Sequence, residues 1–261
     1  MEKYHLQEIT KLASFDSFGG QIVRFVPEWS IFTKDPRVLS TVSMGFKLEF
    51  LEQPFQSYPS PNSVMNKQLC DQEIGSLLQK GATVKAGGPG FISSIFLIPK
   101  KSGRCRRIIN LKNLYRFLVE QPFKMEGFST IRHTIRQREW LAKLDLKDAC
   151  LTIPVFEGHR KFLQFFWKDT RYEFEEWDAP HHLSRLHTYS GDFSASGQAM
   201  VYKARSTLET LGFIISKEKS IENPTQTIEY IGLVINTVTM KFTLPAKKIS
   251  DIQGLCTKAL K

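Results

Sequence analysis

Long hydrophobic runs are missing from this sequence of 261 residues. The longest apolar stretch, Phe91 to Ile98, is interrupted by Ser93 and Ser94 and is too short and too polar to span a bilayer. The first ten residues, MEKYHLQEIT, lack the apolar core of a signal peptide. We therefore expect no membrane partner and an intracellular location, in the cytoplasm or the nucleus.

Cysteine is also scarce. The four cysteines are Cys70, Cys105, Cys150 and Cys256, which lie far apart and form no C-x-x-C pair. This spacing argues against a zinc site and against a disulfide scaffold. We expect reduced thiols, as in intracellular proteins.

Acidic residues are fewer than basic ones, with 26 Asp and Glu against 36 Lys and Arg and a net charge of +10. Such an excess favours a polyanionic partner, most often nucleic acid, although basic proteins without one are common. Hydrophobic residues make up 41% of the chain and include 20 Phe, which excludes disorder by composition. At about 150 residues per domain, we expect one large domain or two small ones.

Helical and alternating patterns are both present. The spacing of Cys70, Ile74 and Leu77 predicts one helix, and a second is expected over residues 199–211. A short basic turn joins two apolar runs between residues 91 and 111, which predicts a β-hairpin. This mixture predicts an α+β fold with antiparallel pairs rather than a βαβ repeat.

Two acids, Asp145 and Asp148, lie at the end of the strand predicted over residues 140–146. Asp145 alternates with Lys143 and Lys147, so we expect these three on one face of the strand. A carboxylate at a strand end suits Mg²⁺, which takes one or two carboxylates together with water and phosphate oxygens. The alternative is a carboxylate paired with a neighbouring lysine, and the residues alone leave both open.

Five cations crowd the turn of the predicted hairpin: Lys100, Lys101, Arg104, Arg106 and Arg107. Such a cluster suits a polyphosphate or a nucleic-acid backbone. A solvated basic turn is the alternative.

Six segments, taken in chain order, resemble the reverse transcriptase of a DIRS-type (tyrosine-recombinase) retrotransposon. They are Gly90–Phe117, Phe123–Arg132, Trp140–Val155, Lys161–Phe165, Leu208–Ser220 and Ile228–Ile235. The resemblance implies reverse-transcriptase-like fingers and palm, with an antiparallel sheet and helices on one face. It also implies an RNA-directed DNA polymerase, a nucleotidyltransferase that uses two Mg²⁺ or Mn²⁺ ions.

The resemblance divides the chain into four parts. Residues 1–63 correspond to a pre-polymerase segment and linker, and residues 64–140 to a fingers-like region. Residues 141–245 correspond to a truncated palm with a primer-grip-like hairpin, and residues 246–261 to the start of the thumb or connection.

Catalytic roles follow from the same resemblance. Asp145 matches the first catalytic aspartate, a ligand to both ions, and the Leu146 carbonyl would assist one of them. Asp192 matches a second metal-binding aspartate, and Lys219 matches the lysine that protonates the leaving pyrophosphate.

Binding roles follow as well. Lys100 and Arg106 would hold the incoming triphosphate. The nucleotide would pass Asp148, Ala149 and Cys150, and the primer grip would comprise Tyr230, Ile231, Gly232 and Leu233.

Three departures from the family pattern predict impaired catalysis. The paired-aspartate hairpin is present as Tyr189-Ser190-Gly191-Asp192, with glycine in place of the first aspartate, and Cys150 replaces an aromatic residue. Only 17 residues separate Phe174 from Asp192, too few for two strands and a helix of ordinary length. We therefore expect an incomplete palm, through an internal deletion.

The implied partners are an RNA or DNA template–primer and deoxynucleoside triphosphates. A ribonuclease H and a tyrosine recombinase of the same element are further expected partners, outside this chain. The alternative function is a non-catalytic nucleic-acid-binding relic, or a decayed transposon fragment with no present role.

Overall fold

The helical spacing of Cys70, Ile74 and Leu77 produces helix α4, Lys67–Gln79, and these three side chains are buried. The helix is followed by Gly81, whose φ of 69° lies in the left-handed region that glycine adopts without steric cost. The predicted helix is confirmed, and it packs against strands of the first of two units.

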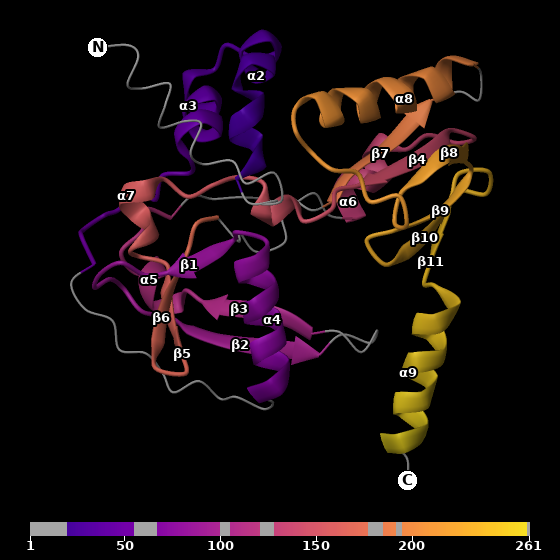
Figure 1. Ribbon diagram of the computed structural model, residues 1–261. Coiled ribbons are helices and arrows are strands. Elements are labelled where there is room, and N and C mark those ends of the chain that lie inside the picture. The colour runs from indigo at the N-terminus through magenta and orange to yellow at the C-terminus, as the bar shows by residue number, and fades with distance from the viewer. Residues whose placement is uncertain are drawn as a thin grey trace. The chain divides into compact units, whose positions relative to one another are not determined.

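The chain divides into two units, formed by Met1–Pro122 with Ala149–Pro180 and by Phe123–Asp148 with His181–Lys261. The computed structural model describes residues 20–54, 67–99, 105–120, 128–176, 185–191 and 195–259. Figure 1 shows these elements coloured along the chain. The predicted palm, residues 141–245, contributes strands to both units.

The first unit combines short helices with antiparallel strands. Its described elements are η2 Gln21–Phe25, α2 Val26–Phe32, α3 Pro36–Met44, α4 Lys67–Gln79, β1 Thr83–Lys85, β2 Ser94–Pro99, β3 Cys105–Asn110, α5 Lys112–Tyr115, η3 Ala149–Leu151, α7 Glu157–Arg160, β5 Gln164–Trp167 and β6 Thr170–Phe174. One sheet has the order β1-β6-β5, and β2 pairs with β3 as the predicted hairpin. Phe165, Phe174 and Leu77 lie in a shared apolar core.

The second unit is built on the sheet β7-β4-β8. Its described elements are α6 Phe128–Thr134, β4 Trp140–Asp145, β7 Arg185–Gly191, α8 Ala195–Thr210, β8 Ile221–Thr225, β9 Thr227–Tyr230, β10 Leu233–Asn236, β11 Lys241–Thr243 and α9 Ala246–Ala259. Helix α8 lies along this sheet in Figure 1 and contacts β4 and β8. Leu141 of β4 packs with Ile131, Ile135, Ile228 and Ile235, which joins α6 and the β9–β10 hairpin to the sheet.

Every pairing within the named sheets is antiparallel, so the predicted α+β class is confirmed. Strand β8 was not predicted, because Pro224 lies within it. Proline is tolerated there because β8 is an edge strand, which need not donate every backbone N–H.

Within the described ranges, each helix is too short or too polar to cross a bilayer. The expected deletion falls between Phe174 and Asp192; of this stretch, residues 177–184 lie outside these ranges, and Arg185–Gly191 forms β7.

His159 links α7 to the segment that contains Leu48. The Leu48 N–H donates to His159 Nδ1 over 3.0 Å, and phenylalanine rings surround the imidazole. Burial lowers the pKa of His159, and the charges of Lys47 and Lys161 lower it further. The native state therefore favours the neutral ring. We expect the free energy of unfolding to be highest above pH 6.5, the ordinary pKa, and to decrease as the pH falls through the lower folded-state value.

Urea unfolding near neutral pH and near pH ~5 tests this expectation. Replacing His159→Gln should reduce the loss of stability at acid pH, because glutamine can accept the Leu48 hydrogen bond without titrating. His133→Gln, on the exposed face of α6, is the control and should retain the loss. An unchanged pH dependence in the His159 variant would contradict the assignment.

A second stability prediction concerns the two-residue turn between β9 and β10. Ile231 and Gly232 have φ of 42° and 74°, the left-handed values of a type I′ hairpin turn. A Cβ at Gly232 would also lie 2.2 Å from Lys248 Nζ, which donates to the Gly232 carbonyl over 3.0 Å. We expect Gly232→Ala to lower the free energy of unfolding by about 1–2 kcal/mol, measured by urea unfolding.

Gly254→Ala provides the matched control in the same unit. Gly254 lies in α9 with no atom within 4 Å of an added Cβ, so alanine should preserve or raise stability. Equal effects at the two glycines would show that the left-handed turn is not the cause.

Candidate functional site

Asp145 ends β4 on the face expected from its alternation with Lys143. Leu144 and Leu146 are buried, whereas Lys143 and Asp145 remain partly exposed. The side chain of Asp145 keeps 20% of its surface accessible. The Asp145 carboxylate can therefore contact other side chains of the protein and also a ligand from solvent.

The segment from Ile214 to Ser220 is fixed against the end of β4 by hydrogen bonds. The Lys147 N–H donates to the Ile214 carbonyl and the Ser216 N–H donates to the Asp145 carbonyl, each over 2.7 Å. The Asp145 N–H donates to Ser220 Oγ over 2.9 Å. These bonds hold a sequence-distant segment beside the carboxylate.

Lys219 lies in this segment and faces the carboxylate. Its Nζ is 4.0 Å from Asp145 Oδ1, and its side chain is 70% exposed. Such an exposed pair contributes at most about 1 kcal/mol to stability. Lys219 lies 74 positions from Asp145 in the sequence, so this contact differs from the pairing with a neighbouring lysine that the sequence offers as an alternative.

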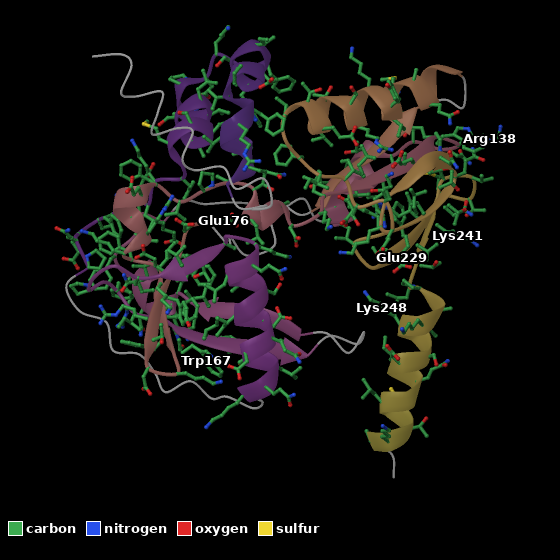
Figure 2. The ribbon with its side chains drawn as sticks, in the orientation of Figure 1. Arg138, Trp167, Glu176, Glu229, Lys241 and Lys248 are labelled. Carbon is green, nitrogen blue, oxygen red and sulfur yellow. The ribbon has the colours of Figure 1, made fainter. Side chains whose placement is uncertain are left out.

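A pocket of about 450 Å³ opens over this pair. It is lined by Lys143, Leu144, Asp145, Glu218, Lys219, Ser220, Ile221, Glu229, Tyr230, Ile231 and Gly232. Two of the three predicted catalytic residues thus share one pocket with three of the four predicted primer-grip residues, while Leu233 begins β10 beside them. Figure 2 labels Glu229 of β9 and Lys248 of α9.

Two backbone carbonyls of the hairpin accept lysine hydrogen bonds. Lys143 Nζ donates to the Glu229 carbonyl over 3.4 Å, and Lys248 Nζ donates to the Gly232 carbonyl over 3.0 Å. Sequence reasoning missed Glu218, Ser220 and Glu229 as pocket residues: they lie in two of the segments that carry the resemblance, but the resemblance assigns them no role.

The register of β7 on β4 determines where the tetrapeptide 189–192 lies. Gly191 pairs with Trp140, whereas Asp145 pairs with Arg185. Trp140 and Asp145 are separated by five residue steps, about 16 Å along a strand. The tetrapeptide's described residues therefore lie toward the opposite end of β4 from Asp145. Asp192 lies outside the described residues, and its role stays a prediction.

The implied pair of divalent ions can be tested against these residues. Two-ion sites bridge their ions with several carboxylate and phosphate oxygens. Among the described residues, no group of three or more Asp, Glu, His or Cys side chains could hold a metal ion. Lys219 Nζ lies 4.0 Å from Asp145 Oδ1, and Leu146 forms an isolated bridge with Ile215. Asp192, the second predicted ligand, lies outside the described residues, so the two-ion site stays a prediction.

The other predicted site residues stay predictions. Lys100 lies outside the described residues, and Arg106 is described only as a backbone partner of Ile98 in the β2–β3 hairpin. Asp148 adopts a left-handed φ of 49°, and the buried Ala149 begins η3, which also contains Cys150.

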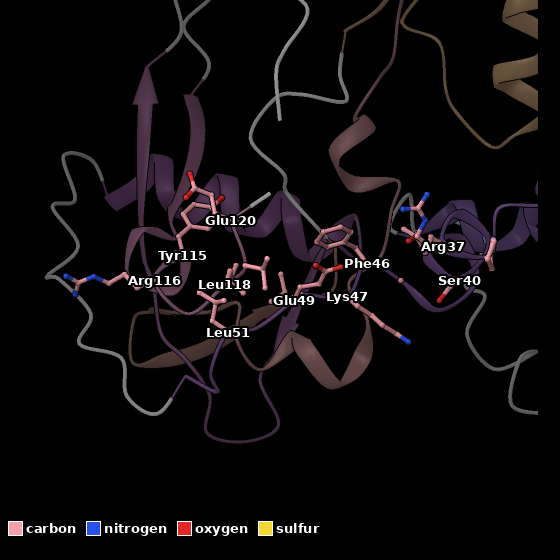
Figure 3. A pocket seen from close by; sticks show the side chains of 15 residues that line it. Arg37, Ser40, Phe46, Lys47, Glu49, Leu51, Tyr115, Arg116, Leu118 and Glu120 are labelled. Carbon is pink, nitrogen blue, oxygen red and sulfur yellow. The ribbon is translucent and has the colours of Figure 1, made fainter. Parts of the chain in front are cut away.

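A larger pocket, of about 980 Å³, lies in the first unit and was not predicted. Figure 3 shows its lining from α3, residues 45–51 and residues 115–120. Arg37, Lys47 and Arg116 are at its rim together with Glu49 and Glu120. Because the rim carries both signs of charge, it selects no single class of ligand.

Comparison with known proteins places this geometry in context. No protein-family model matches the chain. The Pol polyprotein of Ovine maedi visna related virus (strain South Africa) is 23% identical over 224 residues, which cover 69% of this chain and 20% of that protein. The chain thus spans about a fifth of this curated relative.

Solved structures of foamy viral protease-reverse transcriptase share the fold. The complex with an RNA/DNA hybrid has a TM-score of 0.65 at 14% identity, covering 78% of this chain and 30% of that one. The complex with dsDNA has a TM-score of 0.65 at 15% identity, with 78% and 47% covered. The native Prototype Foamy Virus enzyme has a TM-score of 0.62 at 16% identity, with 81% and 33% covered. The chain therefore forms a domain with the fold of reverse transcriptase fingers and palm.

Proposed function

We propose that this chain is a retroelement reverse transcriptase domain of the DIRS type that binds a nucleic-acid template–primer. One observation carries the proposal: Asp145, Lys219 and the turn Tyr230–Gly232, to which the family resemblance assigns roles, line a single pocket. The net charge of +10 favours a polyanionic ligand. The foamy viral enzymes with this fold bind an RNA/DNA hybrid and double-stranded DNA.

We further propose that nucleotidyl transfer is impaired. Stabilising the attacking and leaving oxygens of that reaction requires two cations held about 3.5–4 Å apart. Glycine replaces the first aspartate of the tetrapeptide, so position 191 has no carboxylate to offer an ion. Ribonuclease H and tyrosine recombinase activities of the same element would be supplied from outside this chain.

Binding is tested with a fluorescently labelled DNA primer annealed to an RNA template. Because each neutralised phosphate releases counterions, the logarithm of the affinity should fall linearly with the logarithm of salt concentration. Arg106→Ala should weaken binding severalfold and reduce this slope. Lys67→Ala, an exposed cation of α4, is the charge-matched control and should change affinity less. Absent or salt-independent binding would overturn the proposed function.

Catalysis is tested by extension of the same primer in Mg²⁺ and in Mn²⁺, with products separated on a denaturing gel. We expect the natural chain to incorporate no more nucleotide than its Asp145→Asn variant. Incorporation that this substitution abolishes would instead establish an active polymerase and refute the proposed impairment.

A further inference from the structure

We infer that a surface of the second unit, formed by Arg132, Arg136, Arg138 and Lys241, binds the phosphate backbone of a nucleic acid. We call it the arginine surface. The family resemblance assigns no role to these four residues. The inference rests on the proposed nucleic-acid binding and assigns part of that binding to residues that precede β4, whereas Asp145 ends that strand.

The exposure of the three arginines follows from the way α6 is buried. Ile131 and Ile135 are 6% and 5% exposed and lie in the core that contains Leu141. These two isoleucines anchor the segment between α6 and β4 to the unit. The side chains of Arg132, Arg136 and Arg138 remain exposed.

Hydrogen bonds hold the backbone around Arg138 against the turn between β10 and β11. The Arg138 N–H donates to the Thr237 carbonyl over 2.8 Å, and Thr237 Oγ1 donates to the Glu139 carbonyl over 2.6 Å. Gln226 Nε2 donates to the Arg138 carbonyl over 2.8 Å. Arg138 has a φ of 66°, a left-handed value that is uncommon outside glycine, and these bonds hold it there. Because they use backbone groups of Arg138 and Glu139, the guanidinium group is not needed to build this segment.

The β10–β11 hairpin supplies the fourth cation. Lys241 begins β11 and pairs with Asn236, which directly precedes Thr237. The backbone of Lys241 therefore lies at the same end of this hairpin as Arg138, and the lysine is exposed. Figure 2 labels Arg138 and Lys241 on the second unit.

Few acids accompany these cations. Within residues 128–139 the one acid is Glu139, whose Oε2 accepts the Arg136 N–H over 2.8 Å. Within residues 227–243 the one acid is Glu229, which lies toward the β9–β10 turn, at the other end of the hairpin from Lys241. The arginine surface thus has more positive than negative charge.

The cations of the arginine surface are also unpaired. Among the residues that the structure describes, no ion pair includes Arg132, Arg136, Arg138 or Lys241. Arg205 of α8, in contrast, pairs with both Glu209 and Glu222. The four charges of the surface are therefore available to a ligand.

The chemistry of the guanidinium group indicates the class of ligand. A guanidinium presents five N–H donors in a planar fork, which matches two oxygens of a phosphate. Four cations on one surface favour a ligand with repeated negative charges over a single anion, and a nucleic acid carries one charge on each phosphate. Backbone contacts carry no sequence information, so the surface should bind nucleic acid of any sequence.

Salt dependence of binding to the labelled primer–template tests the arginine surface. Each phosphate contact contributes about 0.7–0.9 to the slope of log affinity against log salt concentration. The double variant Arg136→Gln, Arg138→Gln should therefore have a slope smaller by about 1.4–1.8 and should bind severalfold more weakly. The double variant Arg24→Gln, Arg116→Gln removes two exposed arginines of the first unit and is the matched control, with a smaller expected change in slope.

Two further measurements separate binding from folding. Urea unfolding of the Arg136→Gln, Arg138→Gln variant should match that of the natural chain, because the segment is held through backbone groups. Modification of arginines by phenylglyoxal, followed by mass spectrometry, needs no variant and decides the question if the double variant is unstable. We expect the primer–template to protect Arg136 and Arg138 of the natural chain more strongly than Arg24.

The outcomes distinguish this inference from the proposed function. Absence of salt-dependent binding by the natural chain overturns both. Salt-dependent binding with the same slope in the Arg136→Gln, Arg138→Gln variant, or modification of Arg136 and Arg138 that the primer–template leaves unchanged, overturns the inference alone. If the variant loses binding to poly-L-glutamate but keeps that of the primer–template, the surface belongs to an acidic protein partner and the inference is wrong.

Discussion

The hydrogen bonds between the end of β4 and the segment from Ile214 to Ser220 determine the arrangement of the proposed site. Backbone groups of Asp145 and Lys147 bond to Ser216, Ser220 and Ile214, so the two segments are held together independently of side-chain charge. This docking brings Lys219 to the carboxylate and forms one wall of the pocket, and the β9–β10 hairpin forms another. The electrostatics of the pocket is therefore a consequence of backbone pairing.

Elements with strong periodicity were predictable from the sequence. The α4 and α8 helices and the β2–β3 hairpin follow from apolar spacing and turn residues, since each is specified within about fifteen residues. Strand β8 was missed because its sequence, IENPT, contains proline and shows no alternation. Its conformation is fixed by pairing with β4, a tertiary contact that local propensity does not encode.

The site was predictable in its parts but not in their geometry. Matching the family pattern singled out Asp145, Lys219 and Tyr230, and the fold gathers them in one pocket. The tetrapeptide 189–192 was located in the sequence by its tyrosine and last aspartate, but its place beside Trp140 was not, because a strand's partner residues depend on the alignment of two distant segments. Lys219 and Asp145 are 74 positions apart in the sequence, so their proximity could be seen only in the folded chain.

The proline of β8 has a consequence for how copies of the chain meet one another. A free sheet edge is a template for strand addition from a neighbouring molecule, and proteins often block it with proline or charge. On β8, Pro224 withholds a donor, and Glu222 is held by Arg205 over 2.8 Å. An added strand could not form a continuous set of backbone hydrogen bonds along β8, because Pro224 has no N–H to donate. This edge of the sheet is thus poorly suited to strand addition from a neighbouring copy of the chain.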